Sequence, residues 1–222
     1  MSFVVYFTPE IKHSIKLLLH SDSILETAEL LAAQAANYLH QGADCIYLYN
    51  HMDNAANWEE IKQALEIIGS PETTAIAARR HVMTFQDMHA FGDTAKNHFP
   101  QPLPDDWFSK PIRIAVAPRP EEGRTCRLIL GFDTTETPHV KVWLNNTEVS
   151  LLGTGVNIPH NPVPEVLHTY QSMQHYPSAV KSVMEFDCTG AVTGGANIIV
   201  VKPMQKTDSQ IVWAEISIES KQ

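Results

Sequence analysis

Polar and aromatic side chains come together where an expected buried strand ends, and their types suit the binding of a sugar. The strand covers residues 45–49, and Asn50 and His51 follow it directly. An Asn amide can both donate to and accept from a sugar hydroxyl, and α/β sheets carry their chemistry at the carboxyl ends of strands. Asn50, His51 and the last strand residue, Tyr49, are therefore candidate substrate-binding residues. Their structural alternatives are a turn residue, an exposed loop side chain and a ring packed on helices.

Glu10 holds the corresponding place after the first expected strand, residues 3–7. A carboxylate at the carboxyl end of a strand can act as a nucleophile or as a general acid or base, so Glu10 is the candidate catalytic group of the chain. The alternative is a solvated loop acid or an acid at the start of a helix.

Two tryptophans in the second half of the chain could stack on sugar rings. Trp143 and Trp213 each follow a valine, Val142 and Val212, in a stretch with strand-like alternation. Each ring should therefore point away from the face that the valine occupies. If that face is solvated, both rings are candidate carbohydrate-binding residues. The alternative is that each ring covers the rim of the core or docks against the neighbouring domain.

A helix and the strand behind it must position the first set of candidates. Ser23 followed by Glu26 has the pattern of a capping box, and apolar residues recur at helical spacing over residues 23–41. Gly42 stands where a left-handed C-cap is favoured. The next strand is apolar on both faces, as a covered parallel strand should be. We therefore expect a parallel α/β unit in which residues 3–7 form the neighbouring strand.

Two further helices are expected before the chain changes character. One begins at Asn57, and the next has Ser70 as its cap and Pro71 at its first position and extends to about Arg79. Six of the 14 prolines then fall between residues 100 and 120. Since proline removes backbone donors and restricts the chain, this segment marks a boundary.

After this boundary the hydrophobic period changes from about 3.6 to 2. Alternating or apolar strands are expected over residues 112–116, 127–130, 140–144, 197–201 and 211–218. Asn145-Asn146 is a plausible hairpin turn, although Gly is the usual second residue. Short strands separated by turns favour an antiparallel β-sandwich. The expected organisation is an α/β segment over residues 1–99, a connector over residues 100–111 and a sandwich over residues 112–222.

Several short stretches together resemble a known family. In the first half they are Asn37-Tyr38, Gly42-Ala43-Asp44, Tyr47-Leu48-Tyr49-Asn50 and Gly69-Ser70-Pro71-Glu72. This pattern resembles the last part of the (β/α)8 barrel of glycoside-hydrolase-like proteins from polysaccharide-degrading bacteria. Those proteins usually have Gly where this chain has Cys45. The second half looks like a galactose-binding-like jelly roll, on Leu144-Asn145-Asn146 and Gly195-Ala196-Asn197-Ile198-Ile199.

The resemblance implies a partial (β/α)-barrel segment followed by a jelly-roll-like sandwich. It places Glu10 where such barrels carry a carboxylate nucleophile. A complete barrel needs eight strands and about 250 residues, so the chain should hold only two strand–helix units. Either an N-terminal barrel portion is missing, or the chain assembles into a homo-oligomer or with a partner that supplies the missing sheet. The implied function is the C-terminal portion of a glycoside-hydrolase-like carbohydrate-active protein, inactive alone. The alternatives are a non-catalytic carbohydrate-binding module and an oligomerising structural protein.

Composition narrows the classes of partner, cofactor and cellular location that can be expected. The chain of 222 residues has a formal net charge of −9 with 16 Lys and Arg and no basic cluster, so nucleic acid is not an expected partner. The resemblance implies carbohydrate as the partner. No apolar run is long enough for a membrane span. The absence of a signal-peptide pattern makes a soluble, cytoplasmic protein the default. No metal and no cofactor are expected, and Cys45, Cys126 and Cys188 should be buried thiols in strands.

Overall fold

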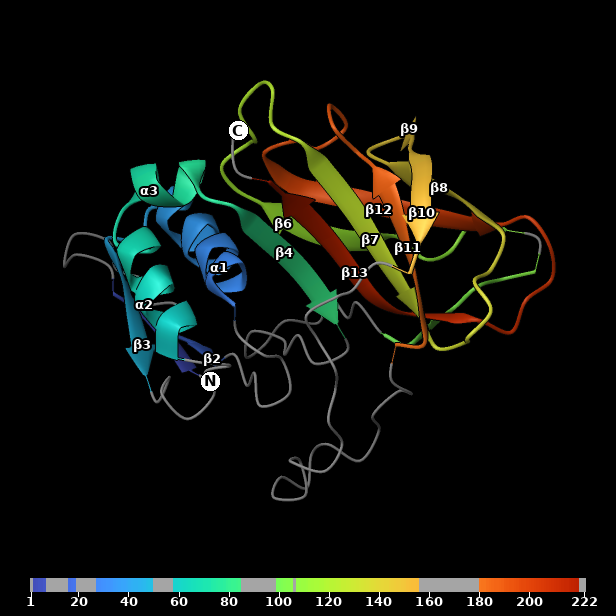
Figure 1. Cartoon of the computed structure of the whole chain (residues 1–222), viewed down its shortest axis with the longest axis horizontal. Helices are drawn as coiled ribbons and strands as arrows, with labels where there is room; N and C mark the ends of the chain where they lie inside the picture. Colours follow the sequence, from blue (N-terminus) through green and yellow to red (C-terminus); the bar gives the residue numbers. More distant parts are fainter. Residues whose placement is uncertain are drawn as a thin grey trace, which may run out of the picture.

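Figure 1 shows the computed structural model of the chain, which describes residues 2–6, 16–18, 27–49, 58–84, 99–105, 107–155 and 180–219. A β-sandwich fills one end, and helices with a small sheet fill the other. The helices are α1 (Ala28–His40), α2 (Trp58–Ile67) and α3 (Pro71–Ile76). The strands are β1 (Ser2–Tyr6), β2 (Lys16–Leu18), β3 (Cys45–Tyr49), β4 (Arg79–Thr84), β5 (Gln101–Pro102), β6 (Ile112–Val116), β7 (Cys126–Phe132), β8 (Val140–Leu144), β9 (Thr147–Glu148), β10 (Ser150–Thr154), β11 (Ser182–Asp187), β12 (Gly195–Pro203) and β13 (Gln210–Ile218).

Helix α1 begins later than predicted and ends where predicted. Thr27 is its N-cap and accepts a hydrogen bond from the Leu30 N–H at 3.4 Å, while Ser23 lies outside the described residues. At the other end the N–H groups of Gly42 and Ala43 donate to the carbonyls of Leu39 and Tyr38. Gly42 has φ +97°, so the helix closes in a Schellman motif that favours glycine.

The small sheet has the strand order β2-β1-β3, and both pairings are antiparallel. The prediction that the first strand and residues 45–49 pair in parallel is therefore wrong, and the described residues do not form a partial (β/α) barrel. An apolar pentapeptide suits any strand that is covered by other elements, but it does not encode the direction of its neighbour. That direction depends on the path of the connecting chain, in which β2 turns back onto β1.

The predicted antiparallel sandwich is confirmed. One sheet has the order β10-β11-β7-β13-β4, with β5 also pairing with β13, and the facing sheet has the order β6-β12-β8-β9. Strands β6 and β8 alternate buried and more exposed residues, as strands with one face on a core should. The core between the sheets is built from both, with Leu128, Leu130, Val142, Ile199 and Ile216 essentially inaccessible.

Strand β4 comes from the first half of the chain and completes the larger sheet. The predicted third helix ends at Ile76 rather than near Arg79, and β4 follows it. The register between β4 and β13 runs from Ile218 opposite Arg79 to Trp213 opposite Thr84. Helix α1 packs on β4 and also contacts α2, so it lies between the sandwich and the small sheet (Figure 1).

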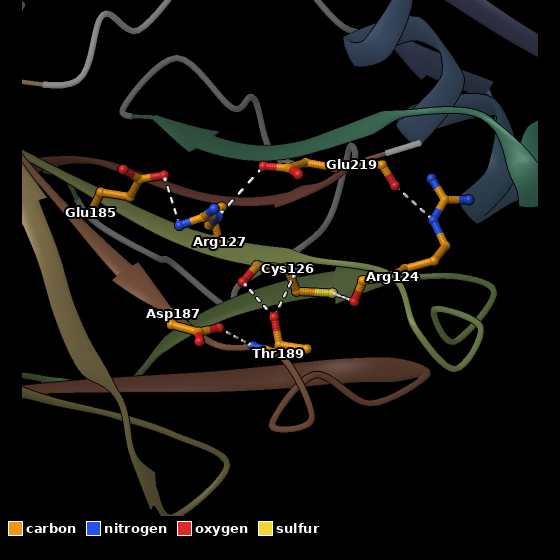
Figure 2. A network of polar contacts seen from close by, with 7 residues as sticks. All are labelled: Arg124, Cys126, Arg127, Glu185, Asp187, Thr189 and Glu219. Carbon is orange, nitrogen blue, oxygen red and sulfur yellow. Dashed lines mark hydrogen bonds and ion pairs between the residues drawn. The ribbon is translucent and has the colours of Figure 1, made fainter. Parts of the chain in front are cut away.

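Arg124 ties the helical layer to the end of the sandwich (Figure 2). The residue is only 3% exposed. Its Nε donates to the carbonyl of Glu219 at 2.7 Å, and its terminal nitrogens donate to the carbonyls of Ala75 and Ala77 at 3.1 and 2.6 Å. One guanidinium therefore satisfies three carbonyls from the end of α3 and the end of β13.

The ends of three strands are joined beside Arg124, as Figure 2 shows. Arg127 of β7 lies 3.7 Å from the Glu185 carboxylate of β11 and 3.5 Å from that of Glu219. The N–H of Cys126 donates to Thr189 Oγ1 at 3.0 Å.

Of the thiols, Cys126 and Cys188 are buried as predicted, whereas Cys45 at the start of β3 is exposed, so its predicted burial is wrong. Within the described residues, no helix is long and apolar enough to cross a membrane.

Candidate functional site: an aromatic groove beside Trp143

The β8–β9 hairpin positions the candidate residue Trp143. Val140, Val142 and Leu144 point into the core, so Lys141 and Trp143 point outward. Asn145 and Asn146 have φ values of +50° and +68°. Asn tolerates this left-handed conformation better than most residues, and two such residues in succession match the two-residue turns that suit hairpin twist. The predicted turn is confirmed.

Trp143 forms one wall of a groove on the outer face of the smaller sheet. The groove has a volume of about 600 Å³. It is lined by Phe108, Trp143, Asn145, Asn146, Ile198 and Val200. Val200 lies directly opposite Trp143 in the register between β12 and β8. The floor is therefore apolar, and the amides of the turn stand at one end.

Phe108 supplies the second aromatic wall from the segment before β6. Its ring meets that of Trp143 edge to face, with centroids 5.3 Å apart and an interplanar angle of 70°. Trp107 makes a similar contact with Phe108 at 5.9 Å and is itself 71% exposed. Such edge-to-face pairs are favoured by the charge distribution of aromatic rings. The three rings form a connected aromatic surface that is open to solvent.

The next residue, Ser109, holds this segment on the sheet. Its backbone N–H donates to the carbonyl of Val201 at 2.7 Å, and its Oγ accepts from the Val201 N–H at 3.0 Å. Ser109 is buried, at 5% exposure. Phe108 is thus placed by two hydrogen bonds at the neighbouring residue, which reduces the conformational freedom that a ligand would have to restrict.

The two turn amides have different roles. Asn145 Oδ1 accepts from the Ile198 N–H at 2.9 Å, while its Nδ2 donates to the Ala191 carbonyl at 3.0 Å and to Asn197 Oδ1 at 2.8 Å. These bonds occupy the Asn145 side chain. Within the part of the chain that the structure describes, the exposed Asn146 amide has no hydrogen bond. Asn146 is therefore the amide that can bond a ligand in the groove.

Trp213 does not contribute to this site, so its predicted role in sugar binding is wrong. It is 1% exposed and packs with Ile129 and Val183, and its Nε1 donates to Glu215 Oε2 at 3.2 Å. The larger sheet is buried on both faces along β13, which lies between β7 and β4. A register shift between Ile211 and Trp213 also interrupts the simple alternation from which exposure was predicted.

The strand-tip candidates are not brought together by the described residues. Glu10, Asn50 and His51 lie outside them, so their predicted roles stay predictions. Tyr49 ends β3 and its backbone pairs with Ser2, but the direction of its side chain is not described. Of the predicted site residues whose side chains the structure describes, Trp143 lies in the groove and Trp213 does not.

Sequence reasoning missed the groove residues that come from other elements. Phe108 belongs to the proline-rich segment that was expected to be a connector, and its only local signal is the Trp107-Phe108 pair. Ile198 and Val200 are outward-facing residues of β12. In the sequence they cannot be distinguished from other apolar strand residues. Their role depends on the pairing of β12 with β8, which no local pattern contains.

Comparison with known proteins gives no match from which a function could be inferred, so the function is inferred from the geometry of the groove. No protein-family model matches the chain, and no curated protein matches it. Among the described residues, no group of three or more His, Cys, Asp and Glu side chains could hold a metal ion. The arrangement therefore offers apolar stacking surfaces and an amide, which can bind a ligand.

Proposed function

We propose that the chain is a carbohydrate-binding module that holds its ligand, without cleaving it, in the groove lined by Phe108 and Trp143. The observation that carries this proposal is a groove that places the rings of Phe108 and Trp143 beside the Asn146 amide, which has no hydrogen bond to any described residue. Small-molecule sites are concave and mostly apolar, with a few polar groups that set orientation. The groove has this composition.

Sugars match both parts of this surface. A pyranose ring presents C–H groups on its faces, which pack on flat aromatic rings, and hydroxyl groups around its edge, which need hydrogen-bond partners. Trp143 has the larger of the two aromatic rings that line the groove, and the Asn146 amide offers a donor and an acceptor at its end. Because the rings and the turn are held by the sheet, binding would require little reorganisation.

We also propose that this module belongs to a carbohydrate-active protein related to glycoside hydrolases. Support comes from the sequence resemblance around residues 37–50. Glu10 is the proposed nucleophile, and the second carboxylate of the pair would come from outside this chain. The purified chain should therefore fail to hydrolyse aryl-glycosides, and turnover by it would contradict this part of the proposal.

The binding proposal is tested by affinity electrophoresis and calorimetry with a panel of soluble polysaccharides. We expect at least one polysaccharide to bind, and Trp143→Ala to weaken that binding at least tenfold, equivalent to about 1.4 kcal/mol. Phe108→Ala should weaken it less, because Phe108 is the smaller wall. Leu151→Ala is the matched control, since Leu151 is an exposed apolar residue on the other sheet.

Circular dichroism of each variant separates loss of binding from loss of fold. Binding that is unchanged in a folded Trp143→Ala variant would contradict the proposal. So would a complete failure of the wild-type chain to bind any polysaccharide of the panel.

A further inference from the structure

Two cations flank the groove on the same outer face of the smaller sheet. Arg113 of β6 lies directly opposite Ile198, which lines the groove. Lys202 lies two residues beyond Val200 on β12 and so points to the same face. Its Nζ stands 5.5 Å from the centroid of the Phe108 ring, within the range of a cation–π contact.

Neither cation is neutralised within the described part of the chain. The neighbouring Lys141 does have a partner, since its Nζ lies 2.9 Å from the Glu148 carboxylate. By contrast, Arg113 and Lys202 form no ion pair with any described residue. The chain as a whole carries a formal charge of −9. The two cations that flank the groove therefore have the opposite sign to the net charge of the chain.

We infer that the ligand of the groove is an anionic polysaccharide, whose carboxylate or sulfate groups are met by Lys202 and Arg113. This inference rests on the proposed function, because it names the class of glycan that the same groove would select. Uronic acids and sulfate esters share the chemistry that the cations would recognise, namely an oxyanion at the edge of a sugar ring.

The register of the sheet places the two cations at different distances from Trp143. Val200 is directly opposite Trp143, so Lys202 is a diagonal neighbour of Trp143 at about 7–8 Å between Cα atoms, within reach of a long side chain. Lys202 can therefore meet an anionic group on the sugar that stacks on Trp143. Arg113 lies two strands from β8, about 10 Å away. It would meet the charge of a neighbouring sugar in the same chain.

The test compares three soluble polymer classes at low and high salt. The probes are a neutral glucan, polygalacturonate as the uronate, and carrageenan as the sulfate ester, each titrated by calorimetry. The variants are Lys202→Gln, Arg113→Gln and the double variant. Lys62→Gln is the matched control, because Lys62 is an exposed lysine on α2, away from the groove.

We expect one or both anionic polymers to bind at least about tenfold more tightly than the neutral glucan at low salt, with the preference falling as salt rises. The double variant should lose most of that preference and keep whatever affinity remains for the neutral glucan. Lys62→Gln should bind as the wild type does. Preference for polygalacturonate would identify carboxylates as the recognised groups, and preference for carrageenan would identify sulfates.

The remaining outcomes separate the two proposals. If the neutral glucan binds as tightly as the anionic polymers and the double variant is unaffected, the inference is overturned while the proposed function stands. If Trp143→Ala retains full binding to the anionic polymers, or single-stranded polyadenylate binds equally well, the attraction is merely polyanionic and both fail.

Discussion

Asn145 donates a hydrogen bond from its Nδ2 to Oδ1 of Asn197 across 2.8 Å, and this bond ties the hairpin of Trp143 to the start of β12. Asn197 is fully buried. Its Oδ1 also accepts from the Thr193 N–H at 2.9 Å, and its Nδ2 donates to the carbonyls of Thr193 and Gly195. The loop before β12 and the turn after β8 are thus organised around one side chain.

Replacing Asn197 should therefore lower the stability of the folded chain. Asn197→Ala leaves several buried backbone groups without partners, so the free energy of unfolding should fall by about 2–3 kcal/mol. Urea denaturation followed by tryptophan fluorescence measures this loss. The control is Asn146→Gly, because glycine accepts the positive φ of +68° at this position and should change stability by less than about 0.5 kcal/mol. Equal losses in both variants would contradict the role of Asn197.

His81 should make the fold sensitive to mild acid. It is buried under α1, near the Asn37 amide, and burial followed by the charge of Arg79 lowers its pKa to about 3. Between pH 6.5 and 3 the unfolded chain therefore binds the extra proton, and stability is lost as pH falls. From pH 7 to pH 5 the loss attributable to His81 is about 2 kcal/mol.

The His81 contribution is isolated by comparing two chains at the same pH values. His81→Asn keeps a polar group near Asn37 but cannot titrate in this range. Its free energy of unfolding should fall by about 2 kcal/mol less than that of the wild type between pH 7 and pH 5. Identical pH profiles for the two proteins would refute the assignment.

The three cysteines should differ sharply in reactivity. Burial raises the pKa of the Cys126 thiol to about 11 and raises that of Cys188 further, whereas Cys45 is exposed. Because the thiolate is the reactive form, a disulfide reagent at pH 8 should release one equivalent rapidly from the native chain. The other two should react only after denaturation. Cys45→Ser should abolish the rapid phase, and a rapid phase that survives this substitution would show that a core thiol is accessible.

Arg124 should be needed for the junction between α3 and the sandwich. A lysine retains the charge but lacks the planar fork that bonds three carbonyls. We expect Arg124→Lys to lower the free energy of unfolding by about 2–3 kcal/mol, since buried carbonyls lose charged donors. Hydrogen exchange should show the loss of protection at residues 70–77 and at the end of β13. Arg119→Lys changes an exposed arginine on the same loop between β6 and β7; it is the control and should have little effect. If hydrogen exchange at these residues is unchanged in Arg124→Lys, Arg124 does not hold α3 against the sandwich.

Short-range features of the fold were predictable because their causes lie within a few residues. Gly42 ends α1 in the left-handed conformation, Ser70 caps α3, and Asn145-Asn146 turns the β8–β9 hairpin. Each depends on local backbone geometry or on a hydrogen bond to a neighbour in sequence. The alternation of β6 and β8 likewise predicted which of their residues face the core.

Features that depend on the partner of an element were not predictable in this way. The apolar strand β3 was expected to have a parallel neighbour, but β1 approaches it antiparallel. The pattern around Trp213 resembled that around Trp143, yet β13 is buried on both faces and β8 is not. In each case the sequence of the strand is compatible with both outcomes.

The amino-acid sequence by itself determined the Asn145-Asn146 turn, the caps at Gly42 and Ser70 and the antiparallel sandwich character of residues 112–218, because these follow from backbone sterics and side-chain alternation. Only the tertiary structure decided which tryptophan remains accessible and which residues join it. Phe108, Trp143, Val200 and Lys202 come from three separate stretches of chain. They meet because β12 pairs with β8 and Ser109 bonds to Val201, and such long-range pairings depend on the packing of the whole sandwich.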